Sequence, residues 1–194
     1  MQRLGMRVDW DRVRHHEDAF EKELLASKRK CQEIVSADFN PLSTLQLRRL
    51  LFDEWNIPPE RYNEKTGSPS TDDETLRTLY TKHNLPAERM ELVHGVRMVR
   101  RYSKLLSTYI RPLAVRYVQA DGRVHPSYNR LPATGRYSSS APNAQNIPAF
   151  LRDIFIPEDG HVFVGADMDQ IELRLLAEES KAALLLRTIS EGLD

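Results

Sequence analysis

A run of strand-forming apolar residues that changes abruptly into a helical pattern constrains this chain more than any other segment. Residues 162–166 (Val-Phe-Val-Gly-Ala) lead directly to Asp167. Four of the six residues from Asp167 to Glu172 are polar or charged, which is too many for a core strand to continue. The pattern therefore predicts a buried strand that delivers Asp167, followed by a helix over about 170–181.

A carboxylate at the end of a buried strand is well placed to bind a hard divalent cation through oxygen. Such cations stabilise negative charge in phosphoryl and nucleotidyl transfer. Asp167 is therefore a candidate metal ligand. The residues alone leave a second interpretation equally open, in which Asp167 only caps the N-terminus of the following helix.

The bulk properties exclude several classes of protein. A chain of 194 residues suffices for one sizeable domain or for two small subdomains that share a core. No apolar run approaches the roughly 20 residues that cross a bilayer. The single cysteine, Cys31, excludes an internal disulfide framework and is typical of a reducing, cytoplasmic setting. Because Cys31 lies in a helical pattern, we expect it to be a small buried apolar residue.

A net charge of zero hides a strong asymmetry along the chain. Residues 91–152 carry ten Lys/Arg against two acids, a net charge of +8, whereas residues 153–194 carry ten acids against three bases, a net charge of −7. A basic middle followed by an acidic end fits a surface that grips a polyanion beside a site that collects cations. Charge counts alone slightly favour the alternative that both segments are merely solvated faces.

Helical periodicity dominates the first half of the chain. The pattern predicts a long helix from the N-cap Asp9 to about residue 37 and a short helix opened by a capping box at residues 43–46. A second capping box at residues 71–74 predicts a helix to about residue 83. A fourth helix is expected from Pro86 to Tyr109 or beyond.

One face of this fourth helix carries basic and hydroxyl residues three or four positions apart: Arg97, Arg101, Lys104, Thr108 and Arg111. A stripe of this kind follows a phosphate backbone well, since it neutralises several charges and releases counterions. The alternative is an ordinary solvated face. The near absence of neighbouring acids in the sequence favours the phosphate-binding interpretation.

The pattern changes after Pro112. Short strands are predicted around residues 114–119 and 123–128, joined by an Asp-Gly turn. Residues 132–148 form an irregular polar segment. Further strands are predicted at residues 153–156 and 161–166, joined by the hairpin turn Pro-Glu-Asp-Gly, and another helix begins near Ala182.

Three segments, in this order, resemble the family A DNA polymerases of the bacterial polymerase I type: residues 107–110 (Ser-Thr-Tyr-Ile), 134–148 (Thr-Gly-Arg-Tyr-Ser-Ser-Ser-Ala-Pro-Asn-Ala-Gln-Asn-Ile-Pro) and 167–174 (Asp-Met-Asp-Gln-Ile-Glu-Leu-Arg). Residues 39–41 (Phe-Asn-Pro) and 64–67 (Glu-Lys-Thr-Gly) match the same family's thumb. The resemblance implies an α+β fold. Residues 1–113 would form a helical thumb of long antiparallel helices, and residues 114–194 would form the first, mainly antiparallel β part of the palm.

The resemblance assigns roles to the residues around Asp167. The Asp167 carboxylate matches the aspartate that binds both catalytic Mg²⁺ ions, and the backbone carbonyl of Met168 matches a ligand of the nucleotide-bound ion. Glu172 matches the glutamate that packs below the incoming sugar and disfavours a 2′-hydroxyl. Gln170 and Ile171 fall with it in the predicted nucleotide-binding segment.

The resemblance also assigns the DNA contacts. Arg136, Asn143, Gln145 and Asn146 match positions that contact primer and template near the growing end. The predicted thumb contacts with phosphates are Arg97, Arg101, Lys104, Ser107 and Thr108. The chemistry agrees, because arginine and amide side chains donate to minor-groove acceptors that every base pair presents, whereas lysine and hydroxyl groups suit phosphates. Without the resemblance, residues 134–148 also fit a plain polar loop held by Asx and Ser turns.

The chain departs from the family pattern in several places. Met168 and Asp169 stand where the family has Tyr and Ser, so an extra charge lies near the predicted metal site. The short link after Pro148 is similar to divergent, phage-borne members. Two-metal transfer requires a second carboxylate, which the family carries on a His-Asp-Glu turn, and the sequence contains no such triplet and no fingers helix.

We therefore expect a fragment of a DNA polymerase that is inactive alone. Its partners would be primer–template DNA and deoxynucleoside triphosphates, without a membrane. Two alternatives remain open: a non-catalytic duplex-binding module, and half of a split polymerase completed by a second chain.

Overall fold

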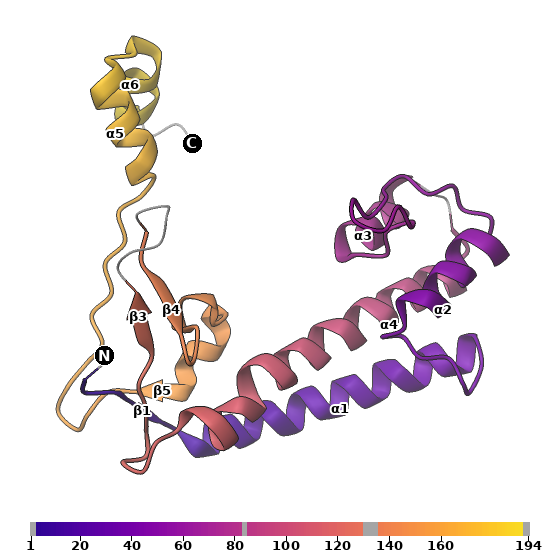
Figure 1. The fold of residues 1–194 in the computed structure, drawn as a ribbon, viewed down its shortest axis with the longest axis horizontal. Coiled ribbons are helices and arrows are strands. Elements are labelled where there is room, and N and C mark those ends of the chain that lie inside the picture. Colours follow the sequence, from indigo (N-terminus) through magenta and orange to yellow (C-terminus); the bar gives the residue numbers. More distant parts are fainter. Residues whose placement is uncertain (1–2, 83–84, 130–135, 192–194) are drawn as a thin grey trace. The chain divides into compact units, whose positions relative to one another are not determined.

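The chain forms two compact units, Met1–Ile156 and Pro157–Asp194. A computed structural model describes residues 3–82, 85–129 and 136–191. Helices and short antiparallel strands confirm the predicted α+β class (Figure 1). Among the described helices, none has the length and apolar character needed to cross a membrane.

The first unit is mainly helical. Its α-helices are α1 (Trp10–Ile34), α2 (Thr44–Arg48), α3 (Asp73–Lys82) and α4 (Ala87–Lys104). Wider π-helical turns extend α2 and α4, namely η1 (Arg49–Glu54), η2 (Leu105–Ile110) and η3 (Leu113–Tyr117). Two 3-10 turns follow later, η4 (Ala144–Asn146) and η5 (Ala149–Ile154).

The described residues of the first unit also contain five short strands: β1 (Met6–Val8), β2 (Arg123–Val124), β3 (Ser127–Asn129), β4 (Ser138–Ser140) and β5 (Phe155–Ile156). β1 lies between β2 and β5 in one antiparallel sheet, with Arg7 opposite both Arg123 and Ile156. β3 and β4 form a separate antiparallel pair, in which Tyr128 faces Ser139. The second unit contains the helices α5 (Ile171–Ser180) and α6 (Ala183–Ser190).

Helices α1 and α4 lie side by side and form the body of the first unit (Figure 1). They come close together at Gly95, where a Cβ atom would lie 2.7 Å from the Cys31 Sγ atom. Cys31 is fully buried, as predicted, and burial raises the pKa of its thiol to about 11. The cysteine is therefore a packing residue, and the missing side chain at Gly95 permits the helices to approach.

Two hydrophobic clusters lie at opposite ends of this helix pair. The clusters bury the apolar stripes expected from the helical spacing, including Val13, Phe20 and Cys31 of α1 and Val93 and Val96 of α4. The cluster nearest the strands also contains Leu105, Leu106, Ile110, Leu113, Val124, Ile147, Leu151, Ile154 and Phe155. The other contains Phe39, Leu47, Leu50, Leu51, Ile57, Leu76, Leu79 and Leu92.

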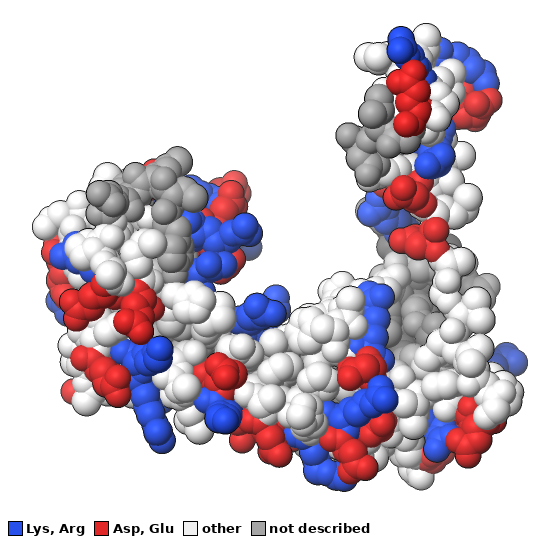
Figure 2. Space-filling view, turned by 180° about the vertical axis from the view of Figure 1, so that it is seen from behind, with Lys and Arg blue, Asp and Glu red and all other residues white. Residues whose placement is uncertain are grey.

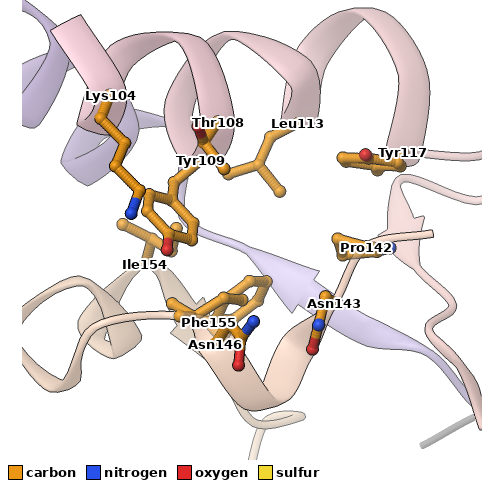
Figure 3. A pocket seen from close by; sticks show the side chains of 11 residues that line it. Lys104, Thr108, Tyr109, Leu113, Tyr117, Pro142, Asn143, Asn146, Ile154 and Phe155 are labelled. Atoms are coloured by element: carbon orange, nitrogen blue, oxygen red, sulfur yellow. The ribbon is translucent and has the colours of Figure 1, made fainter. Parts of the chain in front are cut away.

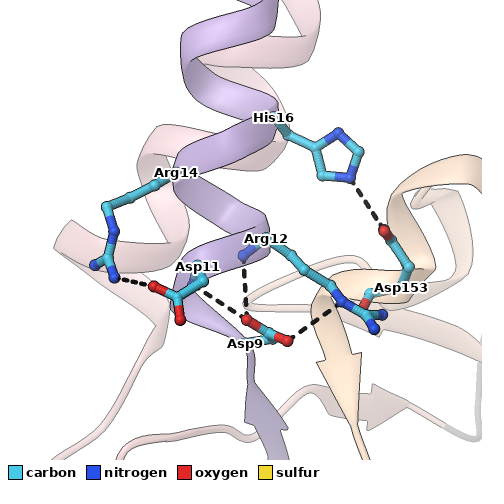
Figure 4. A network of polar contacts seen from close by, with 6 residues as sticks. All are labelled: Asp9, Asp11, Arg12, Arg14, His16 and Asp153. Atoms are coloured by element: carbon cyan, nitrogen blue, oxygen red, sulfur yellow. Dashed lines mark hydrogen bonds and ion pairs between the residues drawn. The ribbon is translucent and has the colours of Figure 1, made fainter.

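The N-terminus of α1 is fixed by a polar network (Figure 4). Asp9 caps the helix as predicted, since its Oδ1 atom accepts the amides of Asp11 and Arg12, both at 3.1 Å. The Arg12 side chain donates to the Asp153 carbonyl oxygen at 2.8 Å, and His16 Nε2 lies 3.1 Å from the Asp153 carboxylate. These contacts attach the base of α1 to the segment that leads into β5.

The two capping boxes form only in part. Ser43 Oγ accepts the Gln46 amide at 3.3 Å, as predicted, but Gln46 Oε1 accepts the amide of Asn40 at 2.7 Å. At the start of α3 the cap is Asp72, whose Oδ1 accepts the Thr75 amide at 2.8 Å. Thr71 is buried one position earlier. A carboxylate at this position caps as well as a hydroxyl, so spacing alone misplaced the cap by one residue.

Two predicted strands are wrong over most or all of their length. Residues 114–117 continue the helix through η3, and Leu113 is buried while its carbonyl accepts the Val118 amide at 3.0 Å. The end of the predicted strand does pair, since Val118 forms an antiparallel bridge with Val124 and the Gln119 amide donates to the Arg123 carbonyl at 2.9 Å. Pro112, which breaks the i→i−4 ladder, lies between the wide turns η2 and η3. Residues 161–166 form no strand, and Val162 and Val164 are 79% and 89% exposed. A strand needs paired backbone groups, and among the described residues no strand lies against this segment.

The other strand predictions are confirmed in part. The predicted strand at 123–128 is divided into β2 and β3, and the one at 153–156 is confined to β5 after a 3-10 turn. The helices expected over 170–181 and near Ala182 are present as α5 and α6.

Gly95→Ala should lower the free energy of unfolding by about 1–3 kcal/mol, because the new methyl group overpacks the contact with Cys31. Urea denaturation measures this loss. Adding Cys31→Ala should recover part of it, since the sulfur atom is removed. Gly165→Ala is the matched control, because no atom lies within 4 Å of the position that its methyl group would take. Equal losses for both alanine variants would contradict the packing account.

Candidate nucleic-acid interface

The continuous helix from α4 into η2 positions the predicted phosphate-contacting residues. Its buried side includes Val96, Val99 and Leu106, so the opposite side is left to polar residues. Arg101, Lys104, Ser107 and Thr108 lie on or near this polar side and are exposed, whereas Arg97 is half-buried. The change to π-helical hydrogen bonding at Leu105 widens the helix within the stripe and changes the direction of the residues that follow.

Acidic residues from neighbouring helices neutralise both ends of this stripe. Arg97 Nε lies 2.7 Å from the Asp73 carboxylate of α3, and this hydrogen-bonded guanidinium lowers the pKa of the Asp73 carboxyl. Arg111 lies 2.6 Å from Glu21 and 3.5 Å from Glu17, both on α1. The expectation that the stripe lacks balancing acids is therefore wrong, because it considered only residues nearby in the sequence.

The middle of the stripe remains cationic. Over the described parts of the chain, Arg101 and Lys104 have no carboxylate partner. Figure 2 shows blue and red side chains interspersed on one face of the first unit, with no broad field of a single sign. The positive charge available to a polyanion is thus local, and it is carried by the last turns of α4.

A buried serine shapes the loop that carries the predicted minor-groove residues. Ser139 Oγ donates to the Pro142 carbonyl at 3.2 Å and accepts the Ala144 amide at 3.1 Å. The chain thereby turns from β4 into η4, and Asn143 and Asn146 are left exposed at the two ends of that turn. The Ser139 hydroxyl thus holds the described part of the loop, and the amides of Asn143 and Asn146 remain exposed.

Two further predicted residues lie on the same segment. Gln145 is exposed, and its Nε2 donates to the Tyr137 carbonyl at 3.2 Å. Arg136 is exposed at the start of the described part of the segment. The motif residues Thr134 and Gly135 lie outside the described residues.

A cavity of about 260 Å³ joins the helix and the loop (Figure 3). Lys104 and Thr108 line it from the helical side, and Asn143 and Asn146 line it from the loop. Four predicted DNA-contacting residues, two from the helix and two from the loop, therefore meet at one cavity. Arg97, Arg101, Ser107, Arg136 and Gln145 do not line it.

Sequence reasoning missed the apolar walls of this cavity. Tyr109 and Leu113 lie on one side, Phe155 lies on the other, and Tyr117 closes the end beside Pro142 (Figure 3). The spacing of Tyr109, Leu113 and Tyr117, each four residues apart, is a helical signal. The wrong strand prediction for residues 114–119 concealed it.

The predicted metal and nucleotide residues belong to the second unit. Asp167 lies in an exposed segment without regular secondary structure, so it is not delivered by a buried strand. It is not a helix cap either, since α5 begins at Ile171 with Gln170 at the N-cap position. Met168 is 68% exposed and Glu172 lies in the first turn of α5. Arg174 Nε donates to the Asp169 carbonyl at 2.7 Å.

The described residues supply only part of a metal site. No group of three or more His, Cys, Asp or Glu side chains among them is arranged to hold an ion. Asp167 and the Met168 carbonyl have the oxygen chemistry that Mg²⁺ prefers, but Mg²⁺ sites also use further ligands. These two oxygen donors therefore fit part of a Mg²⁺ site that is incomplete within the described residues.

Comparisons with known proteins all point to one family. The family model for DNA polymerase family A matches residues 10–194. The whole chain is 35% identical to part of DNA polymerase I from Caldicellulosiruptor bescii and 36% identical to part of the thermostable DNA polymerase I from Thermus aquaticus. The chain spans 23% of the length of each.

A solved structure resembles almost the whole chain. It is the POL domain of Pol1 from M. smegmatis in complex with DNA primer-template and dNTP, with a TM-score of 0.83 and 28% identity. The match covers 98% of this chain and 34% of that one.

Ser139→Ala should loosen the loop that displays Asn143 and Asn146. Removing the buried hydroxyl leaves the Ala144 amide unpaired, which costs about 1–3 kcal/mol locally. Hydrogen exchange at Ala144 should accelerate accordingly. Ser140→Ala, at an exposed neighbouring position, is the control. Unchanged exchange in Ser139→Ala would show that the hydroxyl does not hold the turn.

Proposed function

The chain belongs to DNA polymerase family A, and we propose that it supplies the DNA-binding thumb and the first part of the palm of a template-directed DNA polymerase. The proposed boundary between the two parts is near residue 113. The convergence of Lys104, Thr108, Asn143 and Asn146 on one cavity carries this proposal. It combines a cation and a hydroxyl group suited to phosphate with amides suited to the minor groove.

In the proposed reaction the primer 3′-hydroxyl attacks the α-phosphate of a deoxynucleoside triphosphate, and pyrophosphate leaves. Asp167 and the Met168 carbonyl would hold Mg²⁺, which supplies charge stabilisation for the attacking and leaving oxygens. Gln170, Ile171 and Glu172 would line the nucleotide site, with Glu172 below the sugar. Arg136, Gln145 and the amides of Asn143 and Asn146 would position the primer end.

Residues 1–194 alone should not extend a primer. Two-metal transfer uses a second carboxylate, and no His-Asp-Glu triplet or fingers helix occurs in this sequence. A primer-extension assay on the purified chain, with radiolabelled primer and Mg²⁺, should therefore give no product. Robust extension that Asp167→Ala abolishes would contradict the claim that the site is incomplete.

Two structural observations favour the alternatives to a self-sufficient enzyme. The absence of a three-carboxylate group among the described residues fits a non-catalytic duplex-binding module. The exposed apolar residues Val162, Phe163 and Val164 fit a split polymerase, in which a second chain covers them. Asp167→Ala should leave duplex affinity unchanged in either case. Restoration of extension by a second chain carrying the remaining motifs would identify the split enzyme.

Lys104→Ala should weaken binding of the chain to a primer–template duplex. The plot of log affinity against log salt should become shallower by about 0.9, the value for one lost phosphate contact. Fluorescence anisotropy at several salt concentrations measures both quantities. Lys30→Ala is the matched control, because Lys30 is already 3.3 Å from Glu91. Identical slopes for Lys104→Ala and the unaltered chain would remove Lys104 from the interface.

Asp73→Asn should strengthen duplex binding. The substitution removes the negative charge that pairs with Arg97 and so makes the stripe more positive by one charge. The same salt titration should become steeper by up to about 0.9. A slope and affinity equal to those of the unaltered chain would show that the Asp73 carboxylate does not oppose DNA binding at this end of the stripe.

A further inference from the structure

The cavity between the helix and the loop has an interior that the proposed DNA contacts do not use. Four of its eleven lining residues are the polar ones already described, and the others are aromatic or aliphatic. Ile147, Ile154 and Phe155 are buried there, at 7%, 1% and 8% exposure. A phosphate loses too much hydration to enter an apolar interior of this kind. Phosphate and minor-groove contacts therefore account for the polar rim of the cavity and not for its walls.

Three aromatic rings form much of these walls. Tyr109 and Phe155 lie on opposite sides, and Tyr117 closes one end (Figure 3). Both tyrosines are half-buried. Within the described parts of the chain, none of the three rings stacks on another aromatic side chain. Aromatic faces without a stacking partner favour a flat ligand with a π-system, of which a nucleobase is one.

Two side-chain amides stand beside these rings on a single turn. The Asn146 backbone amide donates to the Asn143 carbonyl at 3.2 Å, so both side chains are carried by one short piece of backbone. Both residues are exposed, and neither side-chain amide has a hydrogen-bond partner among the described residues. Each amide group can both donate and accept a hydrogen bond. The edge of an unpaired nucleobase offers donors and acceptors that match these groups.

The charge and the volume of the cavity narrow the ligand further. Lys104 lines the rim, and none of the described lining residues is acidic, so the cavity favours a ligand with a negative group at its entrance. The volume of about 260 Å³ lies just below the roughly 300–1,000 Å³ of pockets for drug-sized ligands. It therefore suits one ring system and not a base pair. In a duplex, moreover, the faces of a paired base are covered by its neighbours, and only an unpaired base can leave the stack.

We propose that this cavity binds one unpaired nucleobase of a DNA strand, stacked on the rings of Tyr109 and Tyr117. The amides of Asn143 and Asn146 bind the edge of the base, and the Lys104 ammonium binds the phosphate of the same nucleotide. The inference rests on the proposed function, because a primer end held beside the loop supplies the strand. It assigns the apolar interior of the cavity to the base, which contacts with a fully paired duplex leave without a role.

Two primer–templates that differ by one base test the proposal by anisotropy with the full 194-residue chain. In both, the last primer nucleotide is unpaired; it is adenine opposite adenine in one and an abasic residue in the other. The two carry the same number of phosphates, so the difference in affinity reports on the base alone. The primer–template with the base should bind about tenfold more tightly.

Substitutions at Tyr117 assign this preference to the cavity. Tyr117→Leu keeps an apolar side chain but removes the ring, so the ratio of the two affinities should fall to about one. Tyr117→Phe keeps the ring and should keep the ratio. Tyr62→Leu is the matched control and should also keep it, because Tyr62 is 59% exposed and does not line the cavity. Thermal melting confirms that the variants are folded.

Photocrosslinking provides a second measurement that requires no substitution in the protein. A primer that ends in an unpaired 5-iodouracil is irradiated in complex with the unaltered chain, and the modified residue is identified by mass spectrometry. The crosslink should lie at Tyr109, Tyr117 or Phe155. A crosslink found only at residues outside the cavity would overturn the proposal.

The outcomes separate this inference from the proposed function. If Lys104→Ala weakens duplex binding but the base and the abasic residue give equal affinities, the cavity binds no base and the proposed function stands. If equimolar deoxyadenosine monophosphate removes the preference for the base, the cavity binds a free nucleotide and the assignment to a strand is wrong. If the unaltered chain binds no duplex, both the inference and the proposed function fail.

Discussion

The close packing of α1 against α4 is the contact on which the rest of the first unit depends. Because Gly95 has no side chain, Cys31 lies against the α4 backbone and the two helices pack along their lengths. Hydrophobic clusters at both ends then fix the pair. A single face of α4 is consequently left for polar residues, and its position relative to the loop at residues 136–148 is set by the core rather than by the loop itself.

The same packing decides which charges are available for binding. Helix α1 brings Glu17 and Glu21 to Arg111, and α3 brings Asp73 to Arg97. Surface ion pairs of this kind contribute little to stability, but they occupy the cations that form them. Lys104 remains available at the point where the helix widens and meets the cavity. We infer that the interface is short and local, with the uncharged amides of Asn143 and Asn146 beside one lysine.

The parts of the fold that depend on local patterns could be predicted from the sequence. Asp9 as a cap, Cys31 as a buried residue and the long helix after Pro86 follow from side-chain chemistry at fixed spacing. The parts that depend on distant partners could not. Residues 161–166 have strand-forming side chains, yet they form no strand without a neighbour to pair with. The motif resemblance identified the polar residues on both sides of the cavity. The apolar wall residues Tyr109 and Tyr117 could be placed only once the helix was known to continue through η3.

The central claim is that α4 with η2 and the loop at residues 136–148 form one duplex-binding surface. Hydrogen exchange of the chain with and without a primer–template duplex tests it most directly. The account predicts slower exchange on DNA binding in both segments, around residues 101–109 and 138–147, with no such change along the exposed side of α1. Protection of the helix without protection of the loop would contradict it, because the two segments would then not contact the same duplex.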